Sequence, residues 1–275
     1  MTNTRLRTTG RMATVLLICA YSIAPVAWMA LSSTSPSSEM ARVVGPIFPS
    51  QLTGEHFRTL YGTTGFGQQM LNTVVVVVGT LLVVLPLSVL AAYSLTRFEY
   101  RGRTLLARAT LVAYMFAPIM LVVPIFSLFR TLGLTNSHLG LIVAYTTFSL
   151  PLCIWLLRGF FSGIPVSLEE AGLVDGANRL QVLALIVVPS AFPGIIAAAT
   201  FTLIQVFNEY LFARVLISTG SKKTATVGLQ DLATVGTDWG MVMAAAMSMT
   251  IPAMVFYLFV QKYLVAGWGG GGVKG

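Results

Sequence analysis

Long apolar runs alternate with short polar segments along this chain. Each run approaches the roughly 20 residues that a helix needs to cross about 30 Å of hydrocarbon. The runs are continuous blocks without the alternation of a barrel strand, which favours helices. They cover residues 12–31, 70–93, 105–129, 139–161, 191–212 and 241–264. The pattern predicts an all-α membrane protein with six transmembrane helices.

Polar segments divide the rest of the chain. We expect a short N-terminus (1–11), one membrane domain (12–264) and a glycine-rich tail (265–275). Two loops interrupt the membrane domain, one at 32–69 and one at 165–189. The first apolar run follows basic residues, as in a signal peptide. Because the run has the length of a membrane span, we expect an uncleaved first helix.

Composition and charge support a membrane protein and suggest its orientation. Charged residues make up 9% of the chain, against a usual share of about 25%, and the mean hydropathy is +0.82. A net charge of +8 would suggest nucleic acid in a soluble chain, but the basic residues cluster at the ends of the runs. With the N-terminus inside, 11 Lys and Arg residues lie on the inner side and 6 on the outer side. This excess predicts that both termini and the 165–189 loop are cytoplasmic.

The two cysteines lie inside apolar runs. Cys19 belongs to the first run and Cys153 to the fourth. We interpret both as small core residues, not as a disulfide or a metal site.

The 165–189 loop is polar where its surroundings are apolar. Ser167 followed by Glu170 matches a capping box, which predicts a short helix from Ser167 toward Val174. Asp175-Gly176 is a turn signal that would end this helix. The first half of the loop is therefore predicted to be a helix followed by a tight turn.

A second helix is expected from Ala177 to Pro189, where proline would close it. Its apolar side would carry Leu180, Leu183 and Val187. The pattern of this loop leaves two interpretations open. It is either an amphipathic hairpin that rests on the membrane surface or a helix that enters a groove on a soluble partner.

Signals for catalysis, metal binding and nucleotide binding are absent from the sequence. Glu169 and Glu170 are adjacent and predicted to be exposed, so capping and partner contact are favoured over acid–base chemistry. His56 and His138 fall in predicted outer loops without clustered ligands, so neither is assigned any chemistry. No G-x-x-x-x-G-K-[ST] occurs, so an ATP-driven process would need the phosphate site of a separate subunit.

Spacing within the 165–189 loop carries a resemblance to a known family. Glu170-Ala171-Gly172 is followed after three residues by Gly176, and later by Ile186 and Val188-Pro189. This order resembles the Glu-Ala-Ala loop of the permease subunits of binding-protein-dependent ABC importers. Glycine stands here for the second alanine of that motif, and valine stands for its leucine. Residues 169–177 are most similar to the carbohydrate class, and other parts of the chain resemble the maltose-type inner permease subunits of that class.

Further stretches extend the resemblance over most of the chain. They are residues 52–57 with Phe66 and Asn72, residues 91–103, residues 133–137 and the ending 273–275. The glycines at 269–272 depart from the family, which leaves its tail contacts in doubt here.

The resemblance implies a type I ABC importer permease fold in the plasma (inner) membrane of a prokaryote. It implies a non-enzymatic subunit that forms half of the translocation path for a sugar or related polar solute, without a cofactor of its own. The implied partners are two ATP-binding subunits that hold ATP and Mg, a homologous second permease and an extracytoplasmic solute-binding protein. The positions that the resemblance assigns to ATPase coupling are Glu169, Glu170, Ala171, Gly172, Asp175, Gly176, Ala177, Ile186 and Pro189.

Polar residues in the fifth run form one stripe at helical spacing. Gln205, Asn208 and Glu209 lie at i, i+3 and i+4, and Thr202 lies one turn earlier. A polar stripe in a membrane helix points to a substrate path. Alternatively, Asn208 and Glu209 lie close enough to the outer end to reach interfacial water or to bond a neighbouring helix.

Proline recurs inside the apolar runs and is expected to kink some of the helices. The positions are Pro86, Pro118, Pro124, Pro151 and Pro252.

Two other functions compete with an importer subunit. One is an ATP-independent secondary transporter or channel subunit, which would usually carry ionisable residues deep in the bundle, and these are scarce here. The other is a membrane scaffold. Only the importer subunit predicts that a nucleotide-binding subunit co-purifies in fixed stoichiometry.

Overall fold

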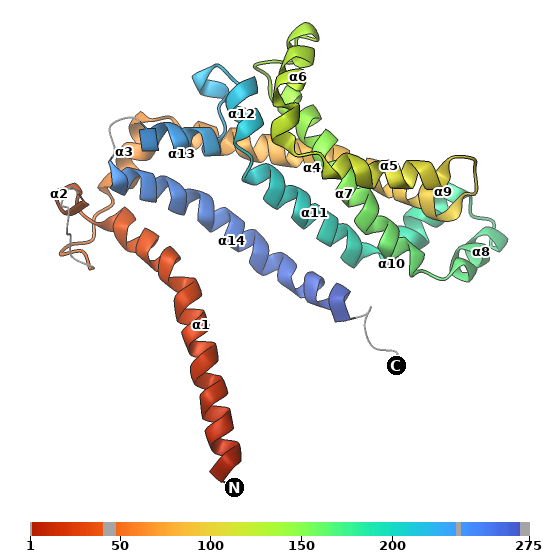
Figure 1. The fold of residues 1–275 in the computed structure, drawn as a ribbon, viewed down its shortest axis with the longest axis horizontal. Coiled ribbons are helices and arrows are strands. Elements are labelled where there is room, and N and C mark those ends of the chain that lie inside the picture. Colours follow the sequence, from red (N-terminus) through yellow and green to blue (C-terminus); the bar gives the residue numbers. More distant parts are fainter. Residues whose placement is uncertain (1, 41–47, 235–237, 270–275) are drawn as a thin grey trace. The chain divides into compact units, whose positions relative to one another are not determined.

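The computed structural model describes residues 2–40, 48–234 and 238–269. In these residues every regular element is a helix, which confirms the predicted all-α class (Figure 1). Residues 270–275 of the predicted glycine-rich tail lie outside the described residues. The elements are α1 (Thr2–Thr34), α2 (Ser37–Met40), α3 (Glu55–Thr63), α4 (Phe66–Arg97), α5 (Arg103–Met115), α6 (Pro118–Thr131), α7 (His138–Ser162), α8 (Val166–Val174), α9 (Arg179–Val182), the π-helical η1 (Leu183–Val187), α10 (Val188–Ser190), α11 (Phe192–Phe207), α12 (Leu211–Leu216), the 3₁₀-helical η2 (Gly220–Lys222), α13 (Ala225–Thr234) and α14 (Trp239–Gly269).

Five of the six predicted apolar runs correspond to one long helix or to a bent pair of helices. The run 191–212 corresponds only to the second half of a bent pair, because the first half, Arg179–Ser190, belongs to the predicted 165–189 loop. Four helices are long and apolar enough to cross a membrane, and counting each bent pair as one span gives six. The single helices are Arg11–Thr34, Phe66–Arg97, His138–Ser162 and Trp239–Lys262. The bent pairs are Arg103–Met115 with Pro118–Thr131, and Arg179–Ser190 with Phe192–Phe207. The six-span arrangement with cytoplasmic termini stays a prediction.

A sharp break divides the third apolar run. α5 and α6 meet at an angle of 99°. Phe116 and Ala117 are extended, with ψ angles of 122° and 126°, and Pro118 begins α6. Proline has no N–H and disfavours helical backbone in the residue before it, so the chain leaves the helix at this point. The other four prolines of the predicted set lie inside continuous helices.

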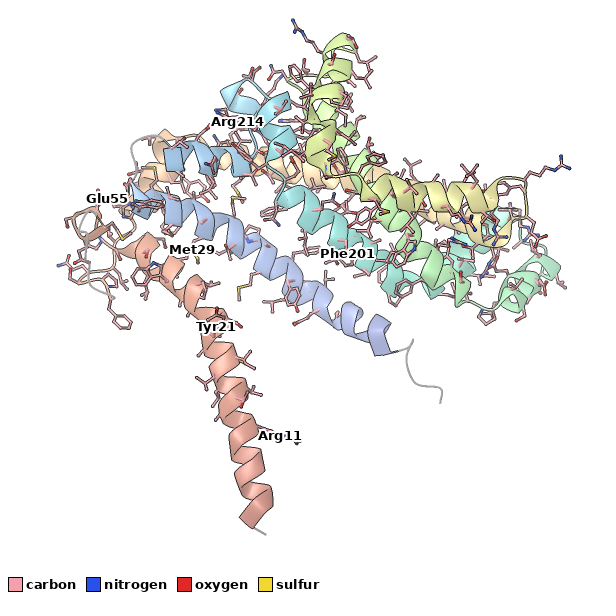
Figure 2. The ribbon with its side chains drawn as sticks, in the orientation of Figure 1. Arg11, Tyr21, Met29, Glu55, Phe201 and Arg214 are labelled. Atoms are coloured by element: carbon pink, nitrogen blue, oxygen red, sulfur yellow. The ribbon has the colours of Figure 1, made fainter. Side chains whose placement is uncertain are left out.

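The apolar surface of α1 is not covered by the described part of the chain. Tyr21 is 84% exposed. Figure 2 shows the side chains of Tyr21 and Arg11 projecting away from α1. Cys19 is exposed as well. The prediction that Cys19 is a core residue is therefore wrong, because the helix that carries it has no protein packed around this stretch. Lipid or another subunit is the suitable surrounding for such a helix.

The centre of one compact unit is α7, which packs against both α5 and α11 (Figure 1). Cys153 on α7 is buried in this core, as predicted. Val182 and Val187 from the 165–189 loop belong to the same cluster as Leu157 and Phe161 of α7. The polar loop is thus built into the core of the helical bundle.

A buried histidine joins the segments of the other compact unit. His56 on α3 is 1% exposed, and its Nε2 lies 2.9 Å from the carbonyl oxygen of Ser35. Its Nδ1 lies 3.5 Å from Oδ2 of Asp238. The other carboxylate oxygen of Asp238 accepts a hydrogen bond from the N–H of Gly240 in the first turn of α14. The role of His56 is thus structural contact at this junction.

Candidate functional site

The first helix of the 165–189 segment is α8. It begins at Val166 with Pro165 as its N-cap residue, and no side chain caps it. The predicted capping box between Ser167 and Glu170 is therefore wrong. Proline already presets the backbone for the helix start, so Ser167 lies within the first turn and not in front of it.

The predicted turn after α8 is confirmed. Gly176 has a φ angle of +88°, a left-handed conformation that glycine adopts without steric cost. Its N–H donates to the carbonyl of Leu173, and the N–H of Ala177 donates to the carbonyl of Gly172. This pair of bonds is a Schellman motif, which closes the helix and reverses the chain.

A capping box is present at the start of the second helix. The N–H of Gln181 donates to Oδ1 of Asn178 at 2.9 Å, and the N–H of Asn178 donates to Oε1 of Gln181 at 2.8 Å. The helix therefore begins at Arg179 and not at Ala177. The spacing Asn-x-x-Gln is a sequence signal that could have located this start.

The buried face of the second helix agrees with the predicted face at Leu183 and Val187 but not at Leu180. Leu180 is 69% exposed, whereas Val182 and Val187 are fully buried. These two valines are five residues apart, which matches the π-helical turn of η1 (Leu183–Val187) better than the α-helical period. Prediction from α-helical spacing identified two of its three residues correctly but missed Val182, because it assumed 3.6 residues per turn.

Close packing between the two helices of the segment occurs at Gly172. A Cβ atom at this position would lie 2.5 Å from Cδ1 of Ile186 and 3.3 Å from Cγ2 of Val182. Glycine therefore lets α8 approach the second helix more closely than alanine would. In this chain Gly172 and Ile186, both predicted site residues, contact each other.

The two adjacent glutamates of α8 lie in opposite environments. Glu169 is 1% exposed, so the prediction that it is exposed is wrong. Its carboxylate accepts hydrogen bonds from Nε of Arg97 and from the hydroxyl of Tyr93, the latter at 3.0 Å. Both partners lie on α4, more than 70 residues earlier in the chain. Glu170 is exposed, as predicted.

The outward face of the segment contains most of the remaining predicted site residues. Ala177 and Ile186 are half-buried. The exposed members are Glu170, Ala171, Asp175, Gly176 and Pro189. A short helix with a buried anchor and an exposed acidic, small-residue face is suited to contact with another protein.

The predicted polar stripe is divided by the end of α11 at Phe207. Asn208 is exposed, and its side-chain amide donates to the carbonyl of Ile204 on its own helix at 2.9 Å. Glu209 instead accepts hydrogen bonds from the first turn of α12 and from the hydroxyl of Tyr145 on α7, at 2.6 Å for the latter. The side chains of the stripe thus have different partners.

The earlier part of the stripe packs against α7. Thr202 is buried, and its hydroxyl lies 3.1 Å from Sγ of Cys153. Oε1 of Gln205 lies 3.5 Å from the hydroxyl of Ser149, at the limit of a hydrogen bond.

Two cavities adjoin the break between α5 and α6. The smaller, of about 140 Å³, contains both Gln205 and Glu209 in its wall. The larger, of about 400 Å³, lies against residues 113–118 and shares Pro118, Phe148 and Gln205 with the smaller one. Asn208 lines neither of them. Aromatic walls with a few polar groups are typical of small-molecule sites.

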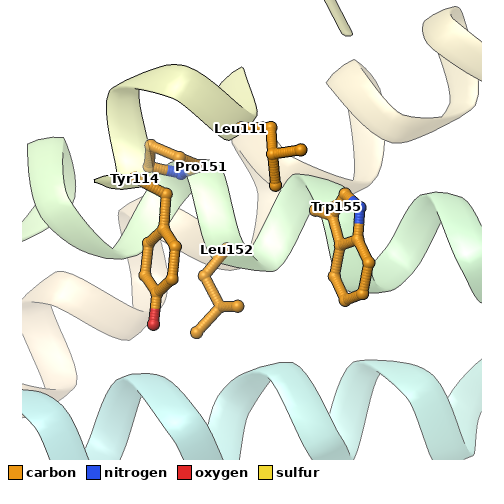
Figure 3. Close-up of a pocket in the computed structure, with 5 residues that line it drawn as sticks. All are labelled: Leu111, Tyr114, Pro151, Leu152 and Trp155. Carbon is orange, nitrogen blue, oxygen red and sulfur yellow. The ribbon is translucent and has the colours of Figure 1, made fainter. Parts of the chain in front are cut away.

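A third cavity, of about 220 Å³, is lined by residues of α5 and α7 (Figure 3). Its walls are Leu111, Tyr114, Pro151, Leu152 and Trp155. Among the residues that the structure describes, no group of three or more His, Cys, Asp or Glu side chains could hold a metal ion.

Comparison with known protein families decides the class of this chain. The family described as the binding-protein-dependent transport system inner membrane component matches residues 84–269, more than half of the chain. The chain belongs to this family. It is the multi-pass inner membrane permease subunit that the sequence predicts, and the match includes the whole 165–189 segment of the permease.

Individual relatives agree with this assignment along nearly the full length of the permease. The trehalose transport system permease protein SugB of Mycobacterium tuberculosis (strain CDC 1551 / Oshkosh) is 35% identical over 94% of this chain and 95% of its own. The trehalose/maltose transport system permease protein MalG of Thermococcus litoralis is 32% identical over 94% and 93%, respectively. These relatives give no support to an ATP-independent transporter.

A solved structure shares the fold of the permease. It belongs to a bacterial ABC transporter involved in the import of the acidic polysaccharide alginate. The two chains superpose with a TM-score of 0.83 at 24% identity, over 94% of this chain and 97% of the other. The predicted ABC importer permease fold is therefore confirmed.

Proposed function

We propose that this permease forms half of the translocation path for a carbohydrate or a related polar solute, and that its 165–189 segment couples the path to an ATP-binding subunit. The observation that carries the coupling role is the geometry of α8. The helix is anchored by a buried glutamate, closed by Gly176, and exposes Glu170 and Asp175 on its outer face.

Coupling requires that a partner bind the segment differently in two states of the transporter. A rigid docking element serves this purpose, because a flexible one would absorb the movement of the partner. Two features stiffen this segment, namely the close contact of Gly172 with Ile186 and the capping box at Asn178. These local contacts support its role as a lever.

The proposed partners follow from the family resemblance. They are two ATP-binding subunits, which hold ATP and Mg on the cytoplasmic side, a second homologous permease and an extracytoplasmic solute-binding protein. The permease itself would hold no cofactor. ATP binding by the partners would favour one orientation of the segment and thereby one opening of the path.

Two observations support the proposed class of substrate. The relatives are named for trehalose and maltose, and the structural neighbour for alginate. The cavities at the break of α5 and α6 combine aromatic walls with Gln205 and Glu209. Discontinuous membrane helices commonly form substrate sites in transporters, which supports a path at this break.

Reversal of one exposed charge tests the docking role. In the complete complex, Glu170→Lys should reduce both the amount of ATP-binding subunit that co-purifies and the rate of solute uptake, because it places a cation on the docking face. Glu99→Lys is the matched control, since Glu99 is an exposed carboxylate just after α4 and outside the segment. Equal co-purification and uptake in the two variants would exclude docking through this face.

The proposed path is tested by removing a cavity-lining amide. Gln205→Ala should lower the uptake of trehalose or maltose at unchanged co-purification of the ATP-binding subunits. Asn208→Ala is the matched control, because this amide lines neither cavity at the break. If Gln205→Ala leaves solute uptake unchanged, the polar stripe serves helix packing and not the translocation path.

A further inference from the structure

We propose that Arg97 and Glu169 form a positioning pair that ties the movement of α8 to the ends of α4 and α7. In this assignment Glu169 is the anchor of the docking helix, and Glu170 alone of the two carboxylates meets the partner. The proposal rests on the docking role proposed above. It gives the two adjacent glutamates separate functions.

Both oxygens of the Glu169 carboxylate are held by α4. Oε1 accepts a hydrogen bond from Nε of Arg97, and Oε2 accepts one from the Tyr93 hydroxyl at 3.0 Å. Tyr93 and Arg97 are four residues apart, so their side chains lie on the same face of α4. The carboxylate is thus fixed in orientation as well as in position.

The same guanidinium also holds the end of α7. Nη2 of Arg97 donates to the carbonyl of Phe161 at 3.0 Å and to the carbonyl of Ile164 at 2.8 Å. Carbonyls at a helix C-terminus carry partial negative charge and attract a cation. Only arginine has a planar fork that can serve a carboxylate and two carbonyls together. One side chain therefore joins three elements.

Burial makes this junction resistant to separation. The Arg97 side chain is 8% exposed and the Glu169 side chain 2% exposed. Pulling the two apart inside the protein would leave each buried charge without its counter-ion, which is strongly unfavourable. A tilt of α8 is therefore expected to carry the ends of α4 and α7 with it.

The second helix of the segment is linked to the same end of α4. Phe98 packs edge-on against Tyr93 with ring centroids 5.7 Å apart, and the guanidinium carbon of Arg179 lies 6.0 Å from the centroid of the Phe98 ring. Both helices of the segment thus contact the residues around Arg97. This arrangement supports movement of the segment as one body.

The test uses the complete importer complex with the permease carrying Arg97→Met, Glu169→Leu or both. Arg97→Met leaves a buried carboxylate unpaired, so less complex is expected in the membrane. The double variant should restore part of the lost complex, since an apolar pair can replace a buried ion pair but leaves the carbonyls of Phe161 and Ile164 without the Arg97 donor. In this double variant we expect the ATP-binding subunits to co-purify while solute transported per ATP hydrolysed falls about tenfold. An unchanged ratio would mean that the pair only stabilises the fold.

A conservative variant covers the case in which the double variant fails to assemble. Arg97→Lys keeps a cation beside Glu169 but cannot reproduce the planar fork. We expect a normal amount of complex and a lower ratio of solute transported to ATP hydrolysed. A wild-type ratio in this variant would contradict the proposal.

The mobility of a spin label on α8 tests whether Glu169 anchors this helix, in the absence of the ATP-binding subunits. The label is placed at Val174→Cys on α8, which is 87% exposed, in a Cys19→Ser background of the full-length permease in lipid. The double variant should increase the mobility of the label, and unchanged mobility would overturn the anchor. The docking role itself is tested separately. Normal co-purification of the ATP-binding subunits with the Glu170→Lys variant would contradict that role, whatever the mobility of the label.

Discussion

The 165–189 segment and the polar stripe at 202–209 both stand out in the sequence, but the structure treats them differently. In the segment, turn, caps and close packing produce one compact unit with an inner and an outer face. In the stripe, helical spacing predicts one shared face, but the helix ends at Phe207 and the side chains turn to different partners. Spacing alone is therefore informative only where the helix continues.

The difference also concerns how polar groups are satisfied. Glu169 is neutralised by a cation from α4, whereas Glu209 accepts N–H groups at the start of α12 and the hydroxyl of Tyr145. Both carboxylates thus hold helices together. What distinguishes the segment is the second, exposed glutamate beside the buried one.

The largest effect is expected within the stripe. Glu209→Ala would leave two backbone N–H groups of α12 and the Tyr145 hydroxyl without their acceptor, at a cost of about 2 kcal/mol in the free energy of unfolding. Asn208→Ala removes a bond from an exposed side chain to its own helix and should change stability by less than about 0.5 kcal/mol. Thermal unfolding of the purified complex measures both. Equal shifts of the unfolding temperature in the two variants would support the single shared face that the sequence predicts for the stripe.

A medium effect is expected at the caps of the segment. Asn178→Ala removes the acceptor of the capping box and should lower local stability by about 1 kcal/mol. Ser167→Ala, at the cap position that the sequence predicts, should change it by less than about 0.5 kcal/mol. The rate of hydrogen exchange of the backbone amides at 166–190 measures the local stability of the segment in both variants. Faster exchange in Ser167→Ala than in Asn178→Ala would show that the cap assignment is wrong.

The smallest net effect is expected at Gly172. Alanine would raise helix propensity by up to about 1 kcal/mol, but its Cβ would overlap Cδ1 of Ile186. Ile186→Val removes this atom, so a double-mutant cycle should give a favourable coupling energy between the two changes. Additive effects in chemical unfolding would show that the close contact at Gly172 has no energetic weight.

Much of the fold could be predicted from the sequence because apolar runs of span length have few alternative structures. Five of the six predicted runs contain a long helix or a whole bent pair, and the run 191–212 contains α11, the second half of a pair. The 99° break could not be located from hydropathy, since residues 111–126 on both sides of it carry no charged side chain. Pro118 marks it, but Pro124 lies inside a continuous helix only six residues later. Proline predicts a possible kink, and tertiary packing decides which kink is realised.

Within the candidate site, the turn could be predicted from residue type, whereas the burial of Glu169 and the helix starts were predicted wrongly. The turn at Gly176 follows from residue type, because its left-handed backbone favours glycine. Burial of Glu169 could not be predicted, since its partners Tyr93 and Arg97 approach it only in the folded chain. The start of the second helix was missed although Asn178 and Gln181 have the spacing of a capping box.

The uncovered surface of α1 has a consequence for membrane insertion. The most apolar stretch of this helix is not buried by any other part of the described chain. Its insertion therefore does not require a folded protein core around it. A helix that satisfies its own backbone hydrogen bonds can enter the bilayer as an independent unit. Such a helix can enter the bilayer during synthesis before the helices around α7 are complete.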